Sequence, residues 1–86
     1  MQWFFDNVLM KYSDKLGAYI RFRRENAEIS LNKFAIEVEM ESSTLSRNEN
    51  NISDINIDNI AKIAKFYNQS VSEFLKDFED YVKANS

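Results

Sequence analysis

The 86-residue chain contains neither cysteine nor histidine. Without cysteine it can form no disulfide and no thiolate metal site, and without histidine it lacks the commonest general base and transition-metal ligand. A glycine-rich phosphate loop is also missing. The carboxylates of Glu37, Glu39 and Glu41 alternate along the chain, so a helix would not bring them to one face. We therefore expect no catalytic residue, no bound metal, no cofactor and no enzymatic activity.

Proline is absent as well, and glycine occurs once. An all-β protein needs many tight turns, which these two residues usually supply, so the composition favours helices. No apolar run approaches the roughly 20 residues of a membrane-spanning helix. The apolar start, residues 1–6, lacks the basic residues and the h-region of a signal peptide. We expect a single all-α domain that is cytoplasmic and has no membrane partner.

Apolar residues recur at helical spacing in six stretches of the chain. The expected helices span about 2–12, 14–27, 31–38, 42–49, 57–67 and 71–83. Ser30 and Asn56 precede the third and fifth of them as candidate N-caps. Ser70 and Glu73 predict a capping box at the start of the sixth, since the hydroxyl and the carboxylate can each bond a free backbone N–H.

Residues 30–49, with the sequence SLNKFAIEVEMESSTLSRNE, contain two short helical patterns separated by a gap that allows only a tight turn. The apolar residues of the two patterns are Phe34, Ala35, Val38 and Leu45. Met40 lies between the patterns and can fill the angle where the helices meet. A helix pair of this kind commonly lays its second helix in the DNA major groove.

In the order and spacing of these residues, the chain resembles the lambda-repressor-like, or Xre, helix-turn-helix family of small bacterial and phage regulators. The resemblance runs without a gap from Leu16 to about Leu75. It is carried by Leu16, Gly17, Ile20, Arg21, Arg24, Ile29, Ser30, Phe34, Ala35, Leu45, Ser46, Arg47, Glu49, Ile60, Ile63, Ala64, Val71, Phe74 and Leu75. It implies that residues 1–86 form one compact five-helix domain. The helix-turn-helix core would span 14–75, with an extra N-terminal helix in 1–13 and an extended C-terminal helix in 76–86.

The chain departs from the family pattern at several places. Leu31 stands where the family has a glutamine that usually donates to a phosphate. Glu39 replaces the glycine of the turn, so it must either adopt a backbone angle that suits glycine better or change the turn slightly. Asn51 replaces the glycine that ends the second helix, where asparagine is tolerated. The loop that follows, residues 52–55, lacks the usual basic residues and proline.

The resemblance also implies roles for residues in and around the segment 42–49, which would be the recognition helix in the major groove of double-stranded DNA. It predicts base contacts from Ser42, Ser43, Ser46 and Arg47, and phosphate contacts from Arg24, Ser30, Lys33 and Asn50. An arginine such as Arg47 can make a bidentate contact to guanine. Arg24 is also expected to form a structural ion pair with Glu49.

The charge distribution argues partly against DNA binding. The net charge is −3. Residues 15–33 carry five cations and two anions, whereas residues 34–60, which include the recognition helix, carry one cation and six anions. Affinity for DNA comes largely from lysine and arginine side chains that neutralise phosphates. The acidic recognition half therefore predicts weak binding unless several subunits act together.

Aromatic residues lie on both sides of the family core. One helix cannot bury Trp3, Phe4 and Phe5 on a single side, so part of this surface should contact a partner. We expect a homodimer through the terminal helices, with an interface that includes these three residues, Phe78 and Tyr81. Alternatively, the terminal helices pack together and enlarge the core.

The sequence is therefore compatible with two functions. The first is a sequence-specific DNA-binding transcriptional regulator that acts as a homodimer. The alternative is a protein-interaction module of the same fold, antirepressor-like or antitoxin-like, with weak or no DNA binding and another protein as its partner. The acidic recognition half is the feature that favours the alternative.

Overall fold

The computed structural model describes residues 12–85, and every regular element in that range is an α-helix. The helices are α1 (Tyr12–Asn26), α2 (Leu31–Glu37), α3 (Ser42–Glu49), α4 (Ile57–Phe66) and α5 (Val71–Ala84). These bounds confirm the all-α class and lie close to five of the predicted ranges. The additional helix predicted at about 2–12 lies outside the described residues, apart from Tyr12, which belongs to α1.

The start of α1 differs from the prediction. The sequence places a boundary between two helices near Ser13, whereas α1 runs through this residue without interruption. Asp14 lies in the first turn of α1, where a carboxylate interacts favourably with the positive end of the helix dipole. The break predicted at residue 13 is therefore absent, and Ser13 is helical.

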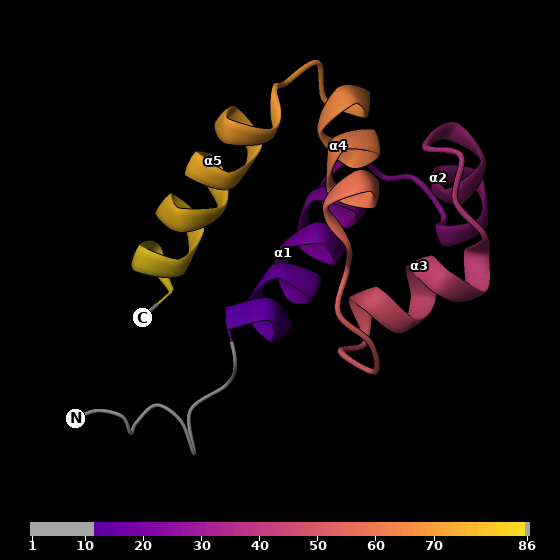
Figure 1. Cartoon of the computed structure of the whole chain (residues 1–86), viewed down its shortest axis with the longest axis horizontal. Helices are drawn as coiled ribbons and strands as arrows, with labels where there is room; N and C mark the ends of the chain where they lie inside the picture. The colour runs from indigo at the N-terminus through magenta and orange to yellow at the C-terminus, as the bar shows by residue number, and fades with distance from the viewer. Residues whose placement is uncertain (1–11, 86) are drawn as a thin grey trace.

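In Figure 1, α1 and α4 lie between α5 on one side and the α2–α3 pair on the other. α1 packs against α3 and α5, α2 packs against α3, and α4 packs against α5. The largest fully buried side chains come one from each helix: Ile20, Phe34, Leu45, Ile63 and Phe74. Burial of each such side chain contributes about 1.5–3 kcal/mol. A single core therefore joins all five helices of the described chain.

The predicted N-caps are present. The Ser30 hydroxyl accepts a hydrogen bond from the backbone of the first turn of α2 at 3.2 Å. The Asn56 side-chain oxygen does the same for α4 at 2.8 Å. Ser70 and Glu73 form the capping box at the start of α5, with bonds of 3.1 and 2.8 Å. These bonds satisfy backbone N–H groups that have no partner within their own helix.

Four helices are followed by a residue with left-handed backbone, and none of these residues is glycine. They are Glu28, Glu39, Asn51 and Asn68, with φ between 57° and 64°. The next N–H then returns to a carbonyl inside the helix: Met40 N donates to the oxygen of Ala35 at 2.9 Å. The unfavourable backbone angle predicted for Glu39, whose φ is 59°, is confirmed.

Replacement of Glu39 with glycine is expected to stabilise the fold by about 1 kcal/mol. The left-handed backbone is costly for a residue with a Cβ, and the extra freedom of glycine in the unfolded chain cancels only part of the gain. The corresponding rise in Tm is about 4–8 °C for a domain of this size. Asn68→Gly is the matched control and should change Tm less, because asparagine tolerates this conformation. Thermal unfolding followed by circular dichroism measures both; an unchanged Tm in Glu39→Gly would contradict the expectation.

Candidate nucleic-acid interface

α3 has an inner and an outer side. The inner side consists of Leu45, Asn48 and Glu49, each at most 4% exposed. On the outer side, Ser42, Ser43 and Arg47 are exposed and Ser46 is half-buried. The four side chains predicted to contact bases therefore share the side of α3 that the core leaves uncovered.

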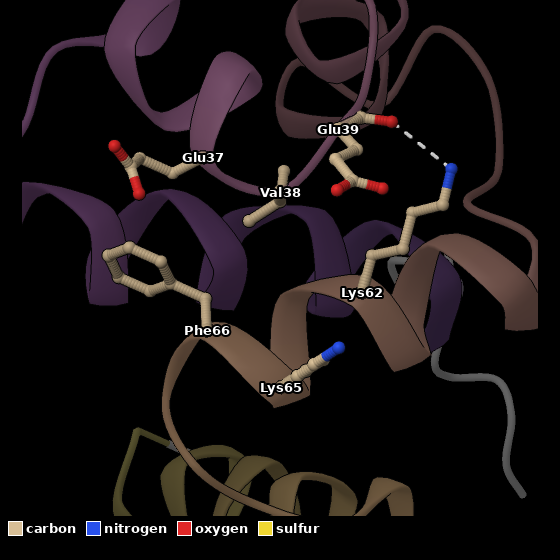
Figure 2. Close-up of a pocket in the computed structure, with 6 residues that line it drawn as sticks. All are labelled: Glu37, Val38, Glu39, Lys62, Lys65 and Phe66. Carbon is tan, nitrogen blue, oxygen red and sulfur yellow. Dashed lines mark hydrogen bonds between the residues drawn. The ribbon is translucent and has the colours of Figure 1, made fainter.

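The turn between α2 and α3 is held from the α4 side. Lys62 Nζ donates to the backbone oxygen of Glu39 at 3.1 Å, the dashed line in Figure 2. Both residues line a surface hollow of about 340 Å³, with Glu37 and Phe66 at its other end in Figure 2. Met40 is partly buried against the core, as its position between the two helical patterns predicts. Lys62 has no distinguishing signal in the sequence, so only the structure connects it with this turn.

The predicted ion pair between Arg24 and Glu49 is present and connects α1 to the end of α3. Arg24 Nε donates to Glu49 Oε2 at 2.8 Å, and Nη2 donates to Oε1 at 3.0 Å. The remaining guanidinium nitrogen, Nη1, donates to the backbone oxygen of Ile29 at 2.9 Å. The side chains are only 12% and 2% exposed. The hydrogen bond to Glu49 raises the pKa of Arg24 above its usual value, so the guanidinium stays charged.

Gly17 allows α1 and α3 to approach closely. A Cβ at this position would overlap the backbone oxygen of Asn48 and would lie 2.6 Å from the side-chain oxygen of Asn51. The overlap with a backbone atom cannot be relieved by a side-chain rotation. The one glycine of the chain therefore sets the distance between α1 and the C-terminal end of α3. The sequence predicts it only as a position shared with the family.

Two asparagines organise the end of α3. The buried Asn48 donates through Nδ2 to the backbone oxygen of Ser53 at 3.2 Å, which holds the loop between α3 and α4 against the helix. The exposed Asn50 donates to the backbone oxygen of Ser46 at 2.8 Å. Asn48 is not among the predicted site residues, because a buried polar residue one position before Glu49 has no periodic signal of its own.

Arg23 is directed into an aromatic cluster. Its guanidinium lies 4.1 Å from the ring centroid of Tyr67, and its Nη1 donates to the hydroxyl of Tyr19. The ring of Phe74 completes the cluster at 5.7 Å. Burial raises the pKa of Tyr67 to about 12. Arg23 thus stabilises the contact between α1, α4 and α5 through cation–π interactions.

The predicted phosphate-contacting residues divide into two groups. Ser30, Lys33 and Asn50 are exposed, and Lys33 has an exposed partner, Glu37, at 4.0 Å. Arg24 differs from them because all three of its guanidinium nitrogens donate to acceptors within the chain. Its position suits the support of α3 from behind more than contact with a phosphate.

These contacts change the charge balance that the sequence indicates. Arg23 and Arg24 direct their charges inward, so they add little to a basic surface. Glu49 is neutralised by Arg24 and does not repel a polyanion as a free carboxylate would. The acidic residues that remain exposed near the α2–α3 turn are Glu37, Glu39 and Glu41. The surface of residues 34–60 is therefore less acidic than the composition of that segment indicates. The surface of residues 15–33 is likewise less basic than its composition indicates.

The residues predicted for a dimer interface have different positions. Trp3, Phe4 and Phe5 lie outside the described residues. Phe78 is 2% exposed, with its ring centroid 5.5 Å from that of Tyr19, so within one chain it belongs to the core. Tyr81 is half-buried. The prediction that Phe78 belongs to a dimer interface is therefore wrong for the single chain, in which this side chain is buried against α1.

Within residues 12–85, no helix is long and apolar enough to span a membrane. The same residues contain no cluster of acidic side chains that could hold a metal ion.

No curated protein matches the sequence. Among solved structures, the crystal structure of the clp gene regulator ClgR from Corynebacterium glutamicum is similar, with a TM-score of 0.72 and 18% sequence identity. The similarity covers 88% of this chain and 81% of that chain and indicates a common fold. A family model described as helix-turn-helix matches residues 20–74, which include α2, α3 and α4. This match covers most of the chain and contains the turn, the inner side of α3 and the Arg24–Glu49 pair, so the chain belongs to the lambda-repressor-like, or Xre, helix-turn-helix family of DNA-binding regulators.

Proposed function

We propose that this protein is a sequence-specific DNA-binding transcriptional regulator that acts as a homodimer and places α3 in the major groove. The observation that carries the proposal is the two-sided character of α3. Its inner side is fixed by Leu45 and by the Glu49 ion pair, while Ser42, Ser43 and Arg47 extend from the other side. A rigid helix with small hydroxyl residues and one arginine on its free side fits the floor of the groove.

The exposed Ser30, Lys33 and Asn50 are proposed to contact phosphates on either side of α3. Ser30 and Lys33 belong to the start of α2, whereas Asn50 follows the end of α3. Arg24 would support these contacts indirectly, by holding Glu49 and the last turn of α3. Phosphate contacts orient a protein on the duplex, and base contacts then select the sequence.

The small number of cations available for phosphate contacts favours DNA binding as a dimer. With Arg23 and Arg24 directed inward, a single subunit neutralises few phosphates, and its non-specific affinity is correspondingly low. Two subunits on two half-sites combine their binding energies, because the second contact becomes intramolecular once the first has formed. We therefore expect the DNA-bound form to be a dimer on a palindrome. Selection of bound sites from a random DNA pool with the purified protein should enrich such a palindrome.

Arg47→Ala is expected to lower the preference for the selected site by about 1–3 kcal/mol at one base pair in each half-site. The reason is the loss of a bidentate contact that only one base pair can satisfy. Titrations of the selected site and of single-base variants with the wild type and with Arg47→Ala measure this preference. Lys76→Ala is the matched control, since it removes the same charge from an exposed position on α5. If Arg47→Ala kept the full preference, the proposed role of α3 would be wrong.

The alternative function, a protein-interaction module with weak or no DNA binding, is supported by one observation. The exposed Glu37, Glu39 and Glu41 lie next to the start of α3, where they would face the phosphates of a bound duplex. A module of this kind should bind no DNA at about 50 mM salt, where electrostatic binding is strong, and should form a stable complex with another protein. The random-pool selection separates the two functions, because only the regulator enriches a sequence.

A further inference from the structure

The outer face of α1 carries a short stripe of four residues. Lys15, Ala18, Phe22 and Glu25 follow one another at spacings of three and four, so they lie along one side of the helix. Phe22 is 43% exposed, although it is a large apolar side chain. Glu25 is exposed, and Lys15 and Ala18 are half-buried. Within its own chain the ring of Phe22 packs against the rings of Tyr81 and Tyr19, with centroids 5.0 and 6.4 Å apart, and the rest of its surface is open.

A hollow lies on the other side of Tyr81, whose ring centroid is 5.0 Å from that of Phe22. It measures about 170 Å³ and is lined by Lys15, Ala18, Tyr81, Val82 and Asn85. A cavity of about 150 Å³ is large enough to hold benzene, so the hollow has the size of a phenyl ring. Ala18 is the smallest of the lining residues, so it leaves the most room at this point of α1. One chain thus presents both an exposed aromatic side chain, Phe22, and a hollow of similar size at Ala18. The two residues are four positions apart on α1, which is about 6 Å along the helix.

We propose that this face binds a second copy of the chain, with the two α1 helices antiparallel and a two-fold axis near residue 20. In that arrangement Phe22 of each copy enters the hollow over Ala18 of the other. Lys15 of each copy lies opposite Glu25 of the other. The inference specifies the interface of the proposed homodimer and rests on that part of the proposed function.

Self-complementarity is what identifies the occupant. Along α1 the stripe consists of a cation, a small residue, a large residue and an anion, in that order. When a second α1 helix lies antiparallel to the first, the cation faces the anion and the small residue faces the large one. A two-fold interface requires this property, because the same patch serves on both subunits. An unrelated partner would place no such condition on the order of the four residues. Glu25 already has an exposed partner in its own chain, Arg21 at 3.1 Å, but such a pair contributes little and leaves Glu25 available.

The position of the face connects it to DNA reading. A second hollow, of about 430 Å³, lies beside Ala18 and Phe22 and extends to Asn50 and Asn51 at the end of α3. The proposed interface therefore borders the C-terminal ends of the recognition helices. Docking through α1 would fix how the two α3 helices are spaced, and this spacing determines which half-site separation is bound.

The test exchanges charges within the stripe and measures association in the absence of DNA by sedimentation equilibrium. Lys15→Glu gives a chain that is acidic at both ends of the stripe, and Glu25→Lys gives one that is basic at both ends. Each variant alone should dimerise more than about tenfold more weakly than the wild type, because like charges then face each other. An equimolar mixture should associate again as a heterodimer, since every pair is opposite in charge. A folding defect in either variant would not be repaired by mixing.

Phe22→Ala supplies a second measurement. It should weaken association by more than about tenfold through loss of the aromatic side chain, while circular dichroism shows an intact helical fold. A wild type that stays monomeric, or a mixture that associates no better than its components, would overturn the inference.

Binding of each variant to a single half-site is measured in parallel. If half-site binding is retained and the charge exchange has no effect, this interface is wrong but DNA binding stands. If no DNA is bound while the charge exchange behaves as stated, the regulator function fails and the interface stands.

Discussion

Glu49→Gln is expected to lower the free energy of unfolding by about 3–5 kcal/mol. The substitution keeps the shape of the side chain but leaves the Arg24 guanidinium, 12% exposed, without its compensating charge. Both hydrogen bonds between the two residues are affected, at 2.8 and 3.0 Å. A loss of this size is a large part of the total stability of a small domain, about 5–15 kcal/mol. Urea unfolding of the wild type and the variant measures it.

An exposed ion pair provides the control. Lys76 and Asp80 form an i,i+4 pair on α5 at 3.6 Å, with side chains 74% and 59% exposed. Asp80→Asn should cost less than about 1 kcal/mol, because water screens such pairs. Comparable losses in Asp80→Asn and Glu49→Gln would show that burial of the Arg24–Glu49 pair contributes nothing. The double variant Arg24→Met with Glu49→Met should recover much of the loss, since it leaves no uncompensated buried charge.

Leu45→Ala is expected to destabilise the fold by about 2–5 kcal/mol. Leu45 is fully buried and is the main apolar contact between α3 and the rest of the core. Its truncation removes methyl groups from water-excluded surroundings and leaves a cavity that α3 alone cannot fill. We therefore expect α3 to be held less rigidly even where the domain remains folded, and the affinity for the selected DNA site to fall further than the loss of folded protein explains.

Ile63→Ala is the matched control for this second effect. Ile63 is also fully buried, but it belongs to α4. Its replacement with alanine should destabilise the domain to a similar degree, about 2–5 kcal/mol. DNA titrations are compared at a temperature at which both variants are fully folded. Equal affinities for the two variants would mean that the packing of Leu45 does not position α3 for binding.

Much of the fold could be predicted because its determinants are local. Helical periodicity in residues 57–67 and 71–83 depends on neighbours a few positions apart, and so do the caps at Ser30, Asn56 and Ser70. The left-handed backbone at Glu39 is predicted differently, from the family glycine whose place this residue takes. The break predicted near Ser13 is wrong, because α1 passes through this residue.

The Arg24–Glu49 pair is an exception among long-range contacts, since only the resemblance to a known family predicts it. Other long-range contacts have no such precedent in the sequence. Arg23 differs from Arg21 only in the direction it takes from α1, yet it lies on the ring of Tyr67 while Arg21 remains at the surface. Likewise, no local feature of the sequence indicates that Lys62 supports the turn between α2 and α3, or that Gly17 allows α1 and α3 to approach closely.

The sequence by itself therefore determined where helices α2 to α5 lie and which residues cap α2, α4 and α5, because these depend on interactions within a few residues. The tertiary structure decided which charges remain on the surface, that Phe78 belongs to the core, and how closely α3 approaches α1. Those properties depend on which helices pack together across long stretches of chain, and packing is set by the shapes of all the side chains at once.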